Sequence, residues 1–231
     1  MSNEFIVALA VTVLSTSNII CFTWRALSLV YWIIATLSGF WGDHDTRLTF
    51  VIATASLREL VEWPIPYFPF NGPVVVAMKV LHQGLLCLLL FLVHNMPERQ
   101  IHKMTFRHRV CYALLVENCV AFNMTWNFVQ TATLVSAMLV QDFHIGLDSV
   151  VSLNVVLLAV CVLVTVTVDL VLLSKARWTA AGYFPMQMWV FYLFHHSVLD
   201  GKTVWVLVVI NVLLLIIKFT PENCKYHMCV V

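Results

Sequence analysis

The feature that most constrains this chain is a series of long apolar runs that contain no charged side chain. Residues 5–24 and 26–42 are uncharged on either side of Arg25, and similar runs recur towards the C-terminus. A helix needs about 20 consecutive apolar residues to cross the hydrocarbon layer of a bilayer. The runs therefore predict an integral membrane protein that crosses the bilayer several times.

We expect one all-α polytopic transmembrane helical bundle of seven or eight spans, because every backbone polar group in lipid must be satisfied within its own segment. Residues 5–42 form either two tightly joined spans or one long helix broken near residues 15–18. The proline-rich segment 64–73 predicts a loop or a shallow re-entrant turn. The other spans are expected at 48–63, 74–94, 110–140, 150–174, 183–198 and 203–217.

Two regions follow from this pattern, a transmembrane helical domain at residues 1–217 and a short cytosolic C-terminal tail at residues 218–231. Basic side chains gather at 99–109 and 175–177, whereas acidic ones gather at 142–148. By the positive-inside rule the basic segments are cytosolic, which places the C-terminus in the cytosol. The 13 Lys and Arg residues nearly balance the 12 Asp and Glu residues, so no field points to a nucleic-acid partner.

Ionisable side chains inside the predicted spans are the most informative residues, because each costs a few kcal/mol at the bilayer centre unless it is paired or hydrated. Arg58 and Glu62 stand four residues apart and predict an ion pair on one helix face. Glu59 would then pair with Lys79 on the next helix. These charges either reach the headgroups from a helix end or line a hydrated lipid path, for which the candidate residues are Arg58, Glu59, Glu62, Lys79, Glu117, Asn118 and Asp169.

Glu117 and Asn118 stand side by side in an otherwise apolar run. They need partners on a neighbouring helix, so they either lock the bundle or line a polar groove. Asp169 lies near the end of its run and close to Lys175, which favours an interfacial position.

Enzymatic chemistry has no support in the sequence, because it contains no P-loop and no GxSxG or GxGxxG motif. His195 and His196 with Asp200 invite a metal interpretation, but clustered-histidine iron sites need several His-rich boxes on one membrane face. The other histidines are isolated. We therefore expect neither a metal nor another cofactor.

Three groups of residues between Ser17 and Trp126 resemble motifs of the XK-related family of membrane proteins, which includes apoptotic phospholipid scramblases. The resemblance covers about half of the chain, and the last 55 or so residues match nothing in it. The matching elements are the segment 24–32, the run Ser56-Leu57-Arg58 leading to Trp63 and an aromatic loop, and Asn95-Met96-Pro97-Glu98-Arg99 followed by Tyr112, Glu117-Asn118 and Trp126.

The resemblance implies movement of membrane phospholipids between leaflets, notably exposure of phosphatidylserine, without ATP or a metal. It favours the plasma membrane over an internal membrane. Arg58, Glu59, Glu62 and Glu117 would line the headgroup path. Two other functions stay open: a small ion or proton channel or carrier with Glu117 and Asp169 as relay groups, and a non-transporting scaffold or accessory subunit bound to a membrane-protein partner.

Overall fold

The computed structural model describes residues 3–38, 46–62, 72–94, 105–167, 181–195 and 201–219, and these ranges are helical apart from short turns. The all-α prediction is confirmed. The helices are α1 (Asn3–Leu37), α2 (Thr46–Glu62), α3 (Gly72–His94), α5 (Phe106–Tyr112), the π-helical turn η2 (Ala113–Glu117), α6 (Asn118–Gln141), α7 (Leu147–Thr167), α8 (Tyr183–His195) and α9 (Gly201–Phe219).

The first apolar region forms one continuous helix, which resolves the alternative that the sequence left open. α1 runs unbroken from Asn3 to Leu37, through the expected break at residues 15–18 and through Arg25. Residues 3–38 include neither proline nor glycine, so nothing in the backbone chemistry interrupts the helix. The proline-rich loop at 64–73 lies mostly outside the described residues, and Pro73 stands in the first turn of α3.

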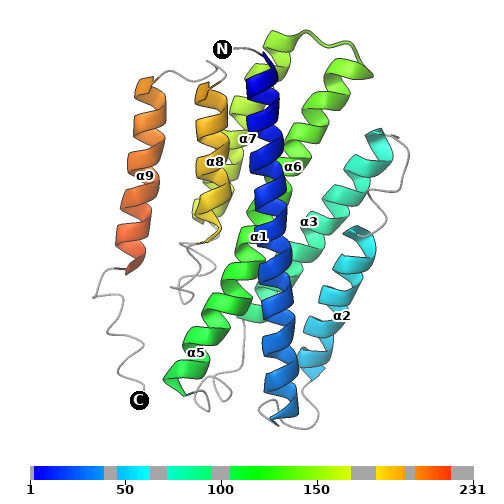
Figure 1. Ribbon diagram of the computed structural model, residues 1–231, viewed down its shortest axis with the longest axis vertical. Helices are drawn as coiled ribbons and strands as arrows, with labels where there is room; N and C mark the ends of the chain where they lie inside the picture. Colours follow the sequence, from blue (N-terminus) through cyan, green and yellow to red (C-terminus); the bar gives the residue numbers. More distant parts are fainter. Residues whose placement is uncertain are drawn as a thin grey trace.

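Consecutive helices run in opposite directions along the long axis of the molecule, except for α5 and α6, which continue in one direction (Figure 1). α5, η2 and α6 form one long inclined helix through the middle of the bundle, and α1 lies in front of it in this view. α6 packs against α1, α3, α7 and α8, while α2 packs against α3 and α9 against α8. α6 is therefore the central element of the fold.

The buried apolar side chains form two large clusters, one in each half of the bundle. The first joins α1, α2, α3 and the start of the central helix and contains the fully buried Ala35 and Leu86. The second joins α6, α7 and α8 and contains the fully buried Met186 and Val190. A small third cluster around Phe122 and Trp126 of α6 is packed by Trp24 of α1. The two halves thus share α6 but have separate cores.

The outer surface of the bundle is also apolar. Two described stretches, Ile19–Leu37 and Pro73–Val93, are long and apolar enough to cross a membrane, judged by length and composition. Core helices of soluble proteins pass the same test, but only 17% and 22% of these two stretches is buried. Large side chains such as Phe22, Leu163 and Trp205 face outward. These stretches give weak support to membrane association, and the expected seven or eight spans stay a prediction.

Candidate functional site

Polar side chains from four helices meet inside the bundle and form what we call the interhelical polar network. The α6 members are spaced by four, four and three residues, which places them on one helix face. They extend over about 16 Å along the helix axis, at 1.5 Å per residue. The network consists of Arg25 of α1, Arg58 of α2, Lys79, His82 and Gln83 of α3, and Cys119, Asn123, Asn127 and Gln130 of α6.

One end of the network joins α1 and α2 to α6. Arg25 Nε donates a hydrogen bond to Asn123 Oδ1 at 2.8 Å, and Asn123 Nδ2 donates to Cys119 O at 2.7 Å. Arg58 is buried, and its positive charge and that of Arg25 both act on the Cys119 thiol. Two guanidinium groups from separate helices therefore lie close enough to this part of α6 for their charges to act on it.

The other end of the network joins α3 to α6. Lys79 Nζ donates to Gln130 Oε1 at 3.0 Å. Asn127 Nδ2 donates to Gln83 Oε1 at 2.8 Å and to Lys79 O at 3.2 Å. His82 is fully buried within the same turn of α3. Because Asn127 lies one helical turn beyond Asn123, the two ends follow each other along α6.

The structure places two of the predicted path residues, Arg58 and Lys79, at different levels of this network. Arg58 lies near Cys119 and Lys79 binds Gln130, eleven residues further along the central helix. The side chains of Glu59 and Glu62 and the whole of Asp169 lie outside the described residues. The Arg58–Glu62 and Glu59–Lys79 ion pairs therefore stay predictions.

Glu117 and Asn118 lie at the end of the π-helical turn. Glu117 is half-buried, and its charge acts on the Tyr112 hydroxyl, which donates to Val93 O at 2.9 Å. Asn118 is buried, and its Oδ1 accepts a hydrogen bond from Ala181 N, immediately before α8, at 2.9 Å. Asn118 thus binds the turn before α8, and a role of Glu117 and Asn118 in a polar groove stays a prediction.

Most members of the network were not predicted from the sequence. Arg25 was treated as an interruption between two apolar runs, but it is the contribution of α1 to the network. The missing signal was helical spacing: Lys79, His82 and Gln83 share a face of α3, as Asn123 and Asn127 share a face of α6. Marking polar side chains at intervals of three and four within each run would have found them.

The hydrogen-bond donors of the network are guanidinium, ammonium and amide groups. Such donors bind an anionic or hydrogen-bond-accepting group better than a metal cation. Among the residues that the structure describes, no three His, Cys, Asp or Glu side chains are grouped to hold a metal ion. His195 is the last residue of α8, and its side chain and the whole of His196 fall outside that part of the chain. No protein-family model, curated protein or solved structure matches the chain.

Proposed function

We propose that this protein crosses the membrane several times and moves phospholipids between the two leaflets, exposing phosphatidylserine. The observation that carries the proposal is the interhelical polar network, which lies inside a bundle whose outer side chains are apolar. The resemblance to the XK-related family points to the same activity. No cofactor is part of the proposal.

The network supplies what a lipid headgroup needs in order to cross hydrocarbon. Transfer of a phosphodiester from water into hydrocarbon costs many kcal/mol unless hydrogen-bond donors replace its hydration shell. A guanidinium group, such as that of Arg25 or Arg58, can bind two phosphate oxygens at once. The apolar outer faces allow the acyl tails to stay in the lipid. The α6 part of the network extends over about 16 Å, roughly half of the ~30 Å hydrocarbon layer.

Helix direction supports the membrane orientation that we propose. α5 begins at one end of the bundle, α9 runs towards that same end, and the turn between α6 and α7 lies at the opposite end (Figure 1). Arg107 and Arg109 stand at the start of α5, so the positive-inside rule assigns this end, and with it the C-terminus, to the cytosol. We propose the plasma membrane as its location.

A lipid-flip assay on the purified protein tests the proposal. In proteoliposomes with a fluorescent phospholipid, dithionite bleaching measures the rate of transfer between leaflets. We expect Arg58→Gln, within the network, and Glu117→Gln, two residues before its Cys119 end, to slow the transfer by ~10-fold or more, which corresponds to about 1.4 kcal/mol in the barrier. Asn154→Leu, a matched polar-to-apolar change on α7 outside the network, is expected to leave the rate unchanged. Equal rates in all variants would contradict the proposal.

The same vesicles separate the other two functions. A trapped pH dye would report proton flux, and flux that depends on Glu117 or Asp169 without lipid transfer would identify a channel or carrier. A scaffold would show neither activity. One observation favours the scaffold as a second candidate: the amides of Asn123 and Asn127 already bind protein groups, as polar side chains do where they hold helices together. Loss of complex formation in Asn127→Leu, with no transport in the native chain, would support it.

A further inference from the structure

The π-helical turn Ala113–Glu117 interrupts the long helix formed by α5 and α6. At its end the backbone N–H of Asn118 donates to Ala113 O, five residues back. In an α-helix the same N–H would bind Leu114 O, four residues back. The carbonyl oxygen of Leu114 is therefore released from its usual donor and can accept a hydrogen bond from another helix.

Two other parts of the bundle are hydrogen-bonded to this turn. Leu114 O accepts from Trp24 Nε1 of α1 at 3.0 Å. On the other side, Asn118 Nδ2 donates to Ala113 O at 2.8 Å, and Asn118 Oδ1 accepts from Ala181 N at 2.9 Å. The turn is thus bonded to α1 through one carbonyl and to the segment that enters α8 through the Asn118 amide.

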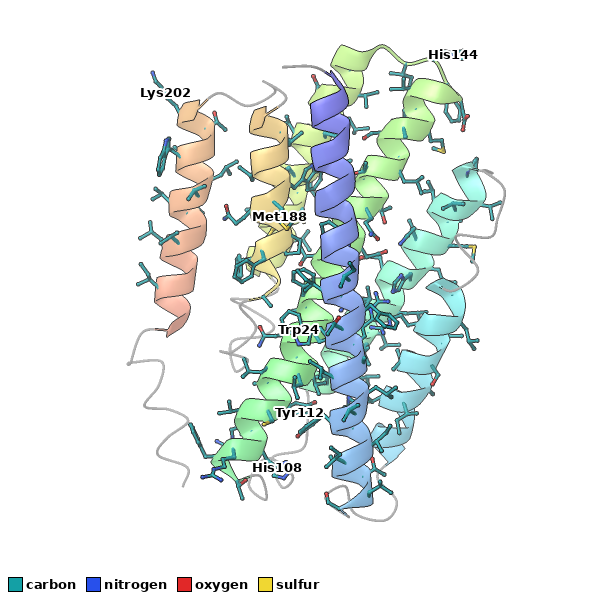
Figure 2. All side chains as sticks on the ribbon, viewed as in Figure 1. Trp24, His108, Tyr112, His144, Met188 and Lys202 are labelled. Atoms are coloured by element: carbon teal, nitrogen blue, oxygen red, sulfur yellow. The ribbon has the colours of Figure 1, made fainter. Side chains whose placement is uncertain are left out.

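Trp24 and Ala181, the partners of the turn on α1 and before α8, also meet at the boundary between the two halves of the bundle. The small cluster of Phe122, Trp126 and Ala181 is packed by Trp24 and Met188, so it contacts α1, α6 and α8 together. Figure 2 shows Trp24 between Met188 and Tyr112 along the long axis of the molecule. The separate cores of the two halves lie on either side of this position.

We infer that the π-helical turn is a two-state joint that couples the position of α8 to that of α1. In the present state the Asn118 side chain donates a hydrogen bond to Ala113 O and accepts one from Ala181 N. When Ala181 leaves, the backbone N–H of Asn118 can return to Leu114 O and close an α-helical turn. Closure shifts α5 relative to α6 by one residue, or roughly 100°, which turns Leu114 O away from Trp24 Nε1. Because coupling is reciprocal, release of Trp24 also loosens Ala181.

Hydrogen exchange on the full chain in lipid nanodiscs tests the joint and requires no transport activity. Asn118→Leu is expected to raise the exchange rate of the Trp24 indole N–H by ~10-fold. The indole signal is assigned by its loss in Trp24→Phe. In that second variant the Ala181 amide is expected to exchange faster by a similar factor, although Trp24 is not its hydrogen-bond partner.

Two control variants isolate the hydrogen-bonded route. Asn154→Leu removes a comparable amide that binds Ser136 Oγ at 2.8 Å, and it should change neither exchange rate. Phe122→Leu alters the ring packing of Trp24, whose centroid lies 5.7 Å away, without removing a bond of the turn. Its effect on Ala181 should be much smaller than that of Trp24→Phe.

Two results would overturn the inference. One is a Trp24 indole that stays protected in Asn118→Leu. The other is a Phe122→Leu variant in which Ala181 exchanges as fast as in Trp24→Phe, because the coupling would then run through packing alone. If Asn118→Leu does not fold, the comparison between Trp24→Phe and Phe122→Leu decides the question.

Discussion

Arg25 demonstrates at the scale of a single residue what a charge inside an apolar helix requires of its neighbours. Its side chain extends from the middle of α1, where the flanking side chains are apolar. Its Nε donates a hydrogen bond to Asn123 Oδ1 on the central helix. A cation in such surroundings is stable only when an acceptor is fixed in place. Asn123 is fixed, because its own amide nitrogen donates to Cys119 O.

Replacing Asn123 should therefore destabilise the bundle. We expect Asn123→Leu to lower the free energy of unfolding by about 1–3 kcal/mol, since the half-buried Arg25 loses the acceptor Asn123 Oδ1. Asn123→Asp keeps an oxygen at the same place and should recover most of the loss. Helical content measured against increasing SDS in mixed micelles gives both values. The same loss in both variants would show that the bond to Arg25 contributes nothing.

The Tyr112 hydroxyl links the central helix to the end of α3. It donates to Val93 O at 2.9 Å, and its ring contacts Tyr31 and Trp32 of α1. We expect Tyr112→Phe to cost about 0.5–1.5 kcal/mol, the net value of one hydrogen bond, because the ring packing is kept. The same unfolding titration measures it, with Tyr31→Phe as the matched control. A larger loss in the control would contradict this assignment.

Charge marks some of the site residues in the sequence, whereas helical spacing is the only signal for the uncharged ones. Arg58 and Lys79 stand out as charges in apolar runs, and the structure places both of them in the network. The amide partners Asn123 and Gln130 carry no charge, and asparagines and glutamines occur in many membrane helices without a common function. Which of them meet Arg25 or Lys79 depends on how the helices pack, and the spacing along one helix does not encode that.

Among the elements, the contact between α6 and the start of α8 depends on a glycine. A Cβ atom on Gly182 would lie 3.3 Å from both Ala121 O and Thr125 Oγ1. We expect Gly182→Ala to push α8 away from α6 and to cost about 1–3 kcal/mol. Gly84 on α3 has open space around the same position, so Gly84→Ala should be neutral or stabilising by up to about 1 kcal/mol. Thermal unfolding in detergent compares them, and equal effects would contradict the close approach.

The helices themselves were predictable, since each apolar run gave a helix close to the expected range. The continuity of α1 was not, because a lone charge such as Arg25 between two apolar runs also marks the junction of two spans. The π-helical turn could not be predicted either. It depends on the bond between Asn118 and Ala181, which are 63 residues apart in the chain. Local propensity contains no information about such a contact.

For the molecule as a whole, the alternating helix directions predict that the two ends of the bundle face opposite sides of the membrane. His108 and His144 mark these ends (Figure 2). We expect Arg107→Cys to react with an impermeant maleimide from the cytosolic side of sealed vesicles and Phe143→Cys from the other side. Both positions are exposed. The substitutions Cys87→Ser and Cys111→Ser remove the exposed cysteines of the described residues and so lower the background labelling. Labelling of both positions from one side would show that the central helix does not cross the membrane.

The length of α1 has a consequence for the lipid around it. Its 35 residues make a rod of about 52 Å, whereas the hydrocarbon layer is ~30 Å thick. The tilt needed to hide the whole rod exceeds the ~40° upper limit of known spans. One end of α1 would therefore protrude beyond the hydrocarbon layer, or the bilayer around it would thicken locally. Such a mismatch is smallest in thick, sterol-rich bilayers, so enrichment in those domains is the expected behaviour of the intact protein.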